Sequence, residues 1–262
     1  MKIGIIGAGN MATALLEGFL KSGAAAPSEL FLSDLSEEKL SVWKKRGVYC
    51  YTDNNTVIEK ADIVIFAVKP NVLSEVLSAA GIRNDNKLYI SIAAGFSIEK
   101  IESFIGGNAK IIRVMPNTPA LVGVGMSVIS VNKNVGKDEV ALVSQLFLSV
   151  GEVVCLDEKY INAATALHSC SPAFIYMLID AMADSGVKYG IDKRTALKLA
   201  AKAVEGSAKM VLLSGEHPQK LKDNVCSPGG TTIEGVLELE RCGFKAGIQA
   251  AIEACVEKAE NM

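Results

Sequence analysis

Short runs of hydrophobic residues alternate with stretches of helical spacing from Met1 to about residue 157. The short runs are rich in β-branched residues and are bounded by Gly, Asn, Asp or Pro, which is typical of strands. They are KIGII, ELFLS, DIVIFAV, KLYISIA, AKIIRV, GMSVIS and GEVVCL. Because such nearly continuous apolar strands need cover on both faces, the alternation predicts an α/β fold with a doubly wound parallel sheet.

Helical spacing is clearest in ATALLEGFLKSG and EEKLSVWKKRG, which lie between the first runs. Gly23 and Gly47 end these stretches, where a helix C-cap is expected because glycine readily adopts a left-handed conformation. We therefore expect a helix on each side of the second strand.

The strand pattern stops near residue 157, and the rest of the chain is spaced as helices. Pro172 is expected to begin one of these helices or to kink it. Several of them are apolar on more than one face, so each needs partners on several sides. We expect this half to pack against a second copy of the chain, with a monomeric helical bundle as the alternative. The expected division is residues 1–157 and residues 158–262.

Composition excludes several classes of function. The net charge is −2 and no long basic run occurs, so a nucleic-acid partner is not expected. The six cysteines form no CxxC pair and the chain has two histidines, so no metal site is expected. The cysteines are interpreted as reduced thiols.

The apolar start of the chain could be mistaken for a signal peptide. Gly4, Gly7 and Gly9 interrupt the apolar stretch and Glu17 follows it, so we interpret it as the first strand and helix. We expect no apolar run of membrane-spanning length and therefore a soluble cytoplasmic protein without a membrane partner.

The segment GAGNMA at residues 7–12 follows the first strand and opens a helix. This is the G-x-G-x-x-A form of the dinucleotide fingerprint, in which Gly7 makes the turn, Gly9 admits a pyrophosphate and Ala12 keeps helix and strand close. The free N–H groups at the helix start, around Asn10 and Met11, favour the anion.

The choice between the two nicotinamide cofactors stays open. Asp34 follows Ala12 by 22 residues at the end of the second strand, where it could accept from ribose hydroxyls, which suits NAD. It would repel a 2′-phosphate, and the next residue is Leu35 rather than an arginine. Ser33, Lys39 and Asn54 could supply the neutral or positive contacts that NADP needs.

Three further loops follow strands of the expected sheet, at the edge where ligands bind in this fold class. AVKP at 67–70 and IAAGFS at 92–97 offer small residues against which a flat nicotinamide ring could lie. Pro70 restrains Lys69. RVMPNTPA at 113–120 is stiffened by two prolines around Asn117. Each alone could be an ordinary turn, but together they favour a site.

SPGGTT at 227–232 is the second candidate site. Ser227 is predicted as a helix N-cap, with Pro228 in the first turn. The two glycines expose backbone N–H groups that attract an anion as small as a carboxylate, and the two threonines place hydroxyls beside it. The segment therefore predicts a receptor for a carboxylate next to a nitrogen, the alternative being a glycine-rich helix start without a ligand.

No strong catalytic base is evident. The chain has no Gly-x-x-Gly segment followed by a Lys-x-x-x-Asn helix in its second half, and His168 and His217 have no neighbouring acid in sequence. An iminium substrate removes this need, because it already carries its proton and hydride addition neutralises it. Positioning and electrostatics then suffice.

GAGNMA, AVKP, RVMPNTPA and DNVCSPGGTTIEG occur in the order and approximate spacing of pyrroline-5-carboxylate reductases, and the chain resembles that family over essentially its whole length. The resemblance implies an N-terminal Rossmann-type domain and an all-α C-terminal domain for substrate binding and dimerisation. It implies a homodimer with interlocked helices, sometimes assembled into larger rings. The implied activity is reduction of 1-pyrroline-5-carboxylate to L-proline by NADPH (NADP) or NADH (NAD).

The resemblance also implies roles for individual residues. The backbone around Ser227, Gly229, Gly230 and Thr231 would hold the carboxylate, and the Thr232 hydroxyl would meet the ring nitrogen. With the fingerprint and the loops, the expected cofactor-binding residues are Gly7, Gly9, Asn10, Met11, Ser33, Asp34, Asn54, Ala67, Lys69, Pro70, Ala94 and Asn117.

Two departures from the family pattern are visible. The family usually has LSGSGPA where this chain has LHSCSPA at 167–173, which puts the substrate range in doubt. Many relatives carry arginine at the position of Leu35, which weakens the case for strict NADPH preference. The alternatives are a reductase of another cyclic imine, a β-hydroxyacid dehydrogenase relative, and a dinucleotide-binding protein without turnover.

Overall fold

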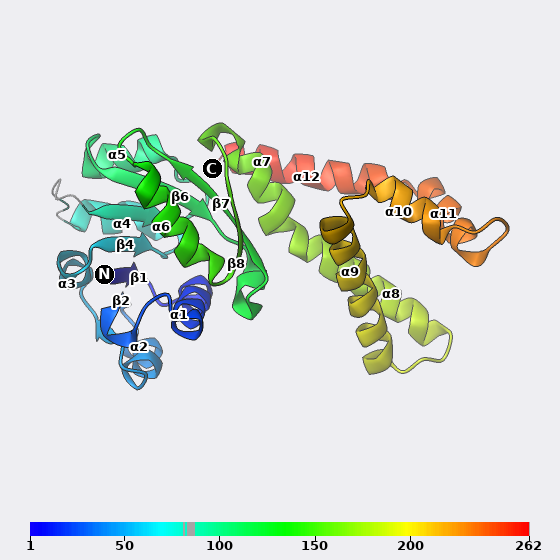
Figure 1. Cartoon of the computed structure of the whole chain (residues 1–262), viewed down its shortest axis with the longest axis horizontal. Helices are drawn as coiled ribbons and strands as arrows, with labels where there is room; N and C mark the ends of the chain where they lie inside the picture. Colours follow the sequence, from blue (N-terminus) through cyan, green and yellow to red (C-terminus); the bar gives the residue numbers. More distant parts are fainter. Residues whose placement is uncertain (81, 83–86, 262) are drawn as a thin grey trace. The chain divides into compact units, whose positions relative to one another are not determined.

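The computed structural model describes residues 1–80, 82 and 87–261, and these form two compact units. The first unit contains Met1–Ser169 together with the chain end from Val256 onward, and the second contains Cys170–Cys255. In Figure 1 Met1–Ser169 runs from blue to green, Cys170–Cys255 runs from yellow-green to red, and the chain end that belongs to the first unit is red. The division at residue 157 that the sequence suggests remains a proposal.

The first unit is built on a sheet of eight strands in the order β3-β2-β1-β4-β5-β6-β7-β8. The strands are β1 Ile3–Ile6, β2 Leu30–Ser33, β3 Tyr49–Tyr51, β4 Ile63–Phe66, β5 Leu88–Ser91, β6 Lys110–Met115, β7 Gly125–Val131 and β8 Gly151–Cys155. Strand order reverses at β1, which lies between β2 and β4. Ile6 pairs with both Ser33 and Phe66, so these three strands end at the same level of one edge.

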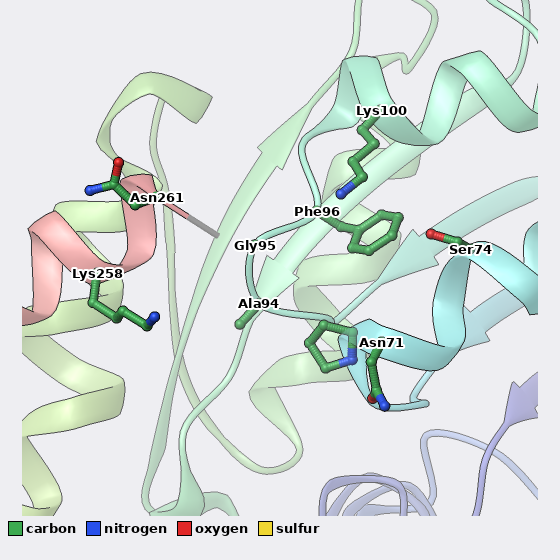
Figure 2. Close-up of a pocket in the computed structure, with 9 residues that line it drawn as sticks. Asn71, Ser74, Ala94, Gly95, Phe96, Lys100, Lys258 and Asn261 are labelled. Atoms are coloured by element: carbon green, nitrogen blue, oxygen red, sulfur yellow. The ribbon is translucent and has the colours of Figure 1, made fainter.

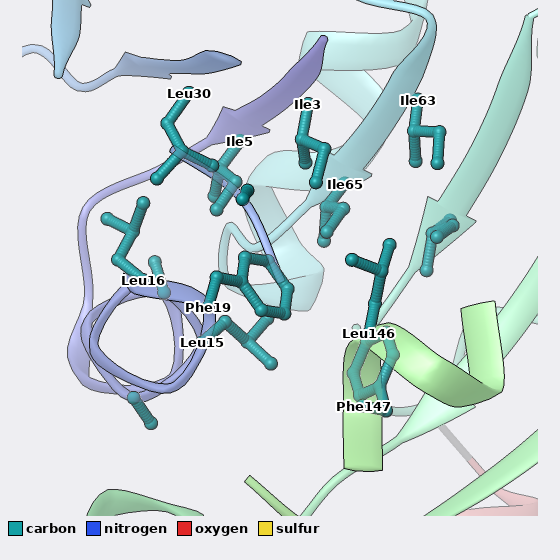
Figure 3. Packing of buried hydrophobic residues seen from close by; sticks show 14 of the residues in the cluster. Ile3, Ile5, Leu15, Leu16, Phe19, Leu30, Ile63, Ile65, Leu146 and Phe147 are labelled. Atoms are coloured by element: carbon teal, nitrogen blue, oxygen red, sulfur yellow. The ribbon is translucent and has the colours of Figure 1, made fainter. Parts of the chain in front are cut away.

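Helices cover both faces of this sheet, as the apolar strands predicted. The α-helices of the first unit are α1 Asn10–Ser22, α2 Glu37–Lys44, α3 Asn54–Lys60, α4 Pro70–Ala79, α5 Ile98–Ile105, α6 Lys137–Leu148 and α7 Ile161–Thr165. One core cluster packs the sheet against α1, α2 and α6, and Figure 3 shows Phe19 of α1 and Phe147 of α6 on the strand isoleucines. The other packs it against α3, α4 and α5.

Side chains alternate between these two clusters along β1. Ile5 belongs to the first cluster and Ile6 to the second, and both are fully buried. Gly4 shares a face with Ile6, and a Cβ there would lie 2.7 Å from Val57 Cγ1 of α3. Burying one such aliphatic side chain stabilises the fold by about 1.5–3 kcal/mol. The core therefore fixes the direction in which β1 delivers the loop after Ile6.

Three expectations about the first unit need correction. β7 runs antiparallel to β6, so the sheet is parallel only in its other pairs. The edge strand β3 was not predicted, because its side chains are half-buried or exposed and give no continuous apolar run. Gly23 is the left-handed C-cap of α1 as predicted, but α2 is capped by Lys45 and Gly47 lies two residues further on, with φ +85°.

The second unit is helical in the residues described, as predicted. It contains α8 Ser171–Lys188, α9 Lys193–Ser214, α10 Pro218–Val225, α11 Thr231–Arg241 and the larger part of α12 Phe244–Glu260. Pro172 lies in the first turn of α8, directly after a π-helical turn at Ala166–Cys170. It therefore begins a helix.

The helices of the second unit leave large apolar side chains exposed. Met177 is 72% exposed and Leu213 is 84% exposed, whereas the fully buried side chains of the unit are small alanines. Such a set of helices buries too little apolar surface to be complete by itself. This arrangement favours a further copy of the chain over a monomeric bundle.

The expectation that no apolar stretch reaches membrane-spanning length is wrong. The continuous helical segment Glu158–Lys188 is long and apolar enough to span a membrane by length and composition. A single helix of this kind is weak evidence for a membrane, because core helices of soluble proteins pass the same test.

Candidate functional site

The loop after β1 is shaped by its two glycines. Gly7 has φ +100°, and a Cβ there would lie 3.0 Å from the Ala67 carbonyl oxygen. Its N–H donates to the Ser33 carbonyl at 2.7 Å, which ties the loop to the end of β2. Gly9 is the N-cap of α1, without a side-chain cap, and a Cβ there would meet nothing within 4 Å. The backbone at the start of α1 is therefore uncapped and open to a ligand at Gly9.

The first N–H groups of α1 are well suited to an anion. The first turn of α1 contains no acidic residue, so nothing in the helix competes for its uncapped N–H groups. The helix dipole adds to their attraction for a phosphate. Asn10 and Met11 are the first two residues of this turn, and the partly buried Met11 packs against the core.

A cavity of about 440 Å³ adjoins this loop at the ends of β1, β2 and β4. It brings together seven of the residues expected to bind the cofactor, namely Gly7, Gly9, Ser33, Asp34, Asn54, Ala67 and Lys69. Sequence reasoning gave no role to Val72 and Glu75 of α4, which also line it. These two residues could not be predicted, because helical spacing indicates that α4 covers the sheet but does not indicate which of its side chains line a cavity.

Asp34 holds the loop together. Its Oδ2 accepts from the Ala8 N–H at 2.8 Å and its Oδ1 accepts from the Ser36 N–H at 2.9 Å. Lys39 Nζ lies 3.4 Å from Oδ2. Partial burial opposes ionisation of Asp34, but the two N–H groups and Lys39 outweigh it, so its pKa lies below the ordinary carboxyl value. Asp34 is therefore an anion that braces the loop.

Ser33 and Asn54 form a second pair beside Asp34. The buried Ser33 hydroxyl donates to Asn54 Oδ1 at 2.8 Å, and Asn54 begins α3. This bond leaves the amide nitrogen of Asn54 as a donor for a ligand. The pair thus offers neutral hydrogen-bonding groups at the end of β2.

The remaining nicotinamide-side residues lie around a different cavity, of about 510 Å³ (Figure 2). Pro70 at the start of α4 and Ala94 after β5 line it, with Phe96 and the two cations Lys100 and Lys258. Lys100 Nζ lies 4.1 Å from the centre of the Phe96 ring. The AVKP segment is therefore divided, since Ala67 and Lys69 face the first cavity and Pro70 faces the second.

Asn117 connects the loop after β6 to two neighbouring backbone segments. Its Oδ1 accepts from the Met126 N–H at 2.8 Å and its Nδ2 donates to the His168 carbonyl at 2.9 Å. It lines neither of these two cavities. The His168 ring in turn contacts the Met115 carbonyl through Nε2 at 2.9 Å, and Ser169 Oγ lies 3.0 Å from that nitrogen. The departure at LHSCSPA thus contributes a packed hydrogen-bond cluster against the stiff loop.

The second candidate site is the start of α11, and two details of its prediction were wrong. Ser227 is not the N-cap and Pro228 is not in the first turn: the helix begins at Thr231 and its N-cap is Gly230, without a side-chain cap. The Ser227 carbonyl accepts from the Gly230 N–H at 3.0 Å, which closes a turn before the helix. Gly229 has φ +65° within that turn. An amphipathic helix pattern does not reveal this extra turn.

The glycines of this turn are required for different reasons. Gly229 adopts a left-handed conformation that disfavours other residues. A Cβ on Gly230 would lie 2.3 Å from Ser227 Oγ. Thr231 and Thr232 follow as the first, exposed residues of α11. This helix start therefore presents uncapped N–H groups and two hydroxyls, which suits a small carboxylate.

Comparisons with known proteins agree on one family. The family model for pyrroline-5-carboxylate reductase dimerisation matches residues 158–262, and the model for NADP oxidoreductase, coenzyme F420-dependent, matches residues 2–95. Pyrroline-5-carboxylate reductase of Escherichia coli (strain K12) is 42% identical, and the match covers 100% of this chain and 98% of the relative. That of Pisum sativum is 38% identical, with 99% and 95% covered.

Solved structures give the same result. Pyrroline carboxylate reductase of Plasmodium falciparum with NADP bound is 35% identical with a TM-score of 0.92, and 100% of this chain and 97% of that chain are covered. The enzyme of Streptococcus pyogenes is 35% identical with a TM-score of 0.90, and 100% and 99% are covered. A reductive aminase of Aspergillus terreus, at 17% identity and a TM-score of 0.62, shares the fold alone.

Proposed function

The chain belongs to the pyrroline-5-carboxylate reductase family, and from this premise we propose how its residues reduce 1-pyrroline-5-carboxylate to L-proline. The chain is an oxidoreductase that acts on a C=N bond with NADPH or NADH and catalyses the last step of proline synthesis. The observation that carries our assignment of residues is the uncapped start of α11, with its left-handed Gly229 and two exposed threonines.

The first unit fits a dinucleotide. Gly9 has no side chain to keep a pyrophosphate away from the backbone, and the uncapped N–H groups at Asn10 and Met11 can donate to it. We assign Ser33, Asp34 and Asn54 to the adenosine side, because they line the cavity at the end of β2. When bound, the nicotinamide supplies the hydride that reduces the imine carbon.

The nicotinamide side is assigned to the loops after β4 and β5. Small side chains at Ala67 and Ala94 leave room for a flat ring, and Pro70 fixes the backbone beside Lys69 at the start of α4. Asn117 contributes by holding the loop after β6 through its bonds to Met126 and His168. Its effect on the cofactor is then indirect.

The start of α11 is assigned to the substrate. The backbone from Ser227 through Gly229 and Gly230 to Thr231 receives the carboxylate, which the helix dipole stabilises by about 0.3–1 kcal/mol, or up to about 2 kcal/mol where partly buried. The Thr232 hydroxyl accepts from the N–H of the protonated ring nitrogen. No side chain has to remove a proton, because the iminium loses its charge when its carbon is reduced.

The chain forms a homo-oligomer, and we propose a homodimer built through residues 158–262. The match of the dimerisation model to this segment and the exposed apolar residues of α8 and α9 support this. We propose residues 1–157 as the cofactor domain. We further propose a soluble cytoplasmic enzyme without nucleic-acid or membrane partners; the net charge of −2 supports the absence of a nucleic-acid partner.

Turnover with three cyclic imines tests this function. We expect oxidation of NADPH or NADH with 1-pyrroline-5-carboxylate and slower oxidation with 1-pyrroline, which lacks the carboxylate. A six-membered imine that carries the carboxylate measures how closely the site fits the ring. If kcat/KM for 1-pyrroline equalled that for its 5-carboxylate, the proposal that the start of α11 binds the substrate carboxylate would be refuted.

A further inference from the structure

Asp34 has little free capacity to bind ribose. Its Oδ2 already receives the Ala8 N–H and the Lys39 ammonium, and its Oδ1 receives the Ser36 N–H. Each carboxylate oxygen has two lone-pair positions, so Oδ2 is filled and Oδ1 keeps one. Two ribose hydroxyls can bind Asp34 together only if Lys39 leaves Oδ2, because the two backbone bonds hold the loop itself.

Lys39 is free to leave. Its side chain is 53% exposed although that of Asp34 is only 14% exposed, and its Nζ lies at 3.4 Å from Oδ2, a long contact for an ion pair. Its backbone is fixed, since its N–H donates to the Ser36 hydroxyl that caps α2. The ammonium therefore moves on a flexible stem from an anchored position at the wall of the cavity.

The charged residues around Lys39 determine which groups its ammonium can pair with. The charged residues that line this cavity in the described chain are Lys39 and Lys69 and the acids Asp34 and Glu75. Glu37, on the same helix as Lys39, is already paired with Lys44 at 2.7 Å. Leu35 offers no charge, so Lys39 is the cation at the end of β2, where the ribose acid lies.

We propose that Lys39 decides the balance between NADPH and NADH by exchanging partners. This inference rests on the proposed function. With NADPH, the Lys39 ammonium leaves Asp34 and pairs with the 2′-phosphate, which would otherwise lie beside an unscreened carboxylate. With NADH, Lys39 is displaced into solvent and a ribose hydroxyl takes its place at Oδ2. One lysine thereby lets a site with an acid at the end of β2 accept both cofactors.

Removing the ammonium has opposite consequences for the two cofactors. In Lys39→Met the 2′-phosphate loses its charged partner and meets the Asp34 carboxylate directly. We expect the Kd for NADP⁺ to rise by about tenfold to a hundredfold, the range for a lost charge-assisted hydrogen bond. The Kd for NAD⁺ should stay the same or fall, because the second position on Oδ2 is vacant.

Calorimetric titration of the full-length protein with NADP⁺ and NAD⁺, without imine substrate, measures this directly. Lys44→Met is the matched control, because Lys44 is an exposed lysine of the same helix that pairs with Glu37 and does not line the cavity. A Kd for NADP⁺ in Lys39→Met that depends less on salt than in the wild type would support the charge role further.

Two outcomes would overturn the proposal. If Lys39→Met weakened both dinucleotides by the same factor, Lys39 would act only by supporting the loop. If neither Kd changed, the ammonium would not reach the phosphate. Both outcomes leave the proposed reductase activity intact, whereas a wild-type protein that bound neither dinucleotide would refute the proposed function itself.

Discussion

A methyl group added at the N-cap of α11 is expected to impair substrate binding without affecting the cofactor. In Gly230→Ala the new Cβ would lie 2.3 Å from Ser227 Oγ and 3.1 Å from the Ser227 carbonyl oxygen. Both distances are shorter than an ordinary contact, so the Ser227 side chain must leave its rotamer and the Ser227 carbonyl must shift by a few tenths of an ångström. A displaced rotamer costs about 0.5–1.5 kcal/mol. The larger effect falls on the N–H groups that the turn aims at the carboxylate.

Steady-state kinetics with 1-pyrroline-5-carboxylate measures this effect. Loss of one charge-assisted hydrogen bond to the carboxylate lowers kcat/KM by about tenfold to a hundredfold, or about 1.5–3 kcal/mol. The Kd for the dinucleotide should not change, since its site lies in the first unit. Gly235→Ala is the matched control: Gly235 lies within the same helix, and a Cβ there meets nothing within 4 Å.

A second substitution separates steric displacement from other causes. Adding Ser227→Ala to Gly230→Ala removes the hydroxyl that the new Cβ meets at 2.3 Å. We expect the double variant to recover part of the lost kcat/KM, because the remaining contact at 3.1 Å requires only a small shift. A Gly230→Ala enzyme with wild-type kcat/KM would refute the reasoning, since it would mean that the turn does not position the substrate.

Three further substitutions test the substrate site, the core and the loop after β2. Thr232→Val should lower kcat/KM by about tenfold to a hundredfold through loss of the bond to the charged nitrogen, and unchanged kinetics would exclude Thr232 from the site. Gly4→Ala should lower the free energy of unfolding in urea by about 1–3 kcal/mol, because its Cβ would lie 2.7 Å from Val57 Cγ1 and 2.9 Å from Ala61 Cβ, and an unchanged midpoint would contradict this packing. The folded-state pKa of Asp34 is lowered, so ionised Asp34 should stabilise the fold above the ordinary carboxyl pKa of about 3.9. That contribution should be lost as pH falls through the folded pKa, so the difference in unfolding free energy between wild type and Asp34→Asn should shrink on acidification. A difference that does not depend on pH would refute this prediction.

The strand and helix pattern predicted the sheet and its cover because both depend on local periodicity. β1, β2 and β4 are continuous apolar runs, and their buried side chains form the two clusters of the core. The direction of β7 is not encoded in that periodicity, since parallel and antiparallel strands share a period of two. β3 was missed for a related reason, as an edge strand with half-buried side chains lacks the apolar run.

The sequence predicted the positions of the two candidate sites, because glycines and helix starts mark both of them, but it did not predict their side-chain hydrogen bonds. Gly7 was predicted to make the turn after β1, and it has φ +100°, whereas the left-handed conformation of Gly229 was not predicted. The hydrogen bonds of Asp34 were not predictable, because they depend on how the ends of β1 and β2 meet. The same holds for Ser227, which resembles an N-cap in sequence but precedes the helix by one turn.

A crystal structure of the protein with bound L-proline tests the central claim most directly. We predict the proline carboxylate within hydrogen-bond distance of the backbone N–H groups at the start of α11, with the ring nitrogen beside the Thr232 hydroxyl. Proline bound elsewhere, with residues 227–232 free of ligand, would contradict the account.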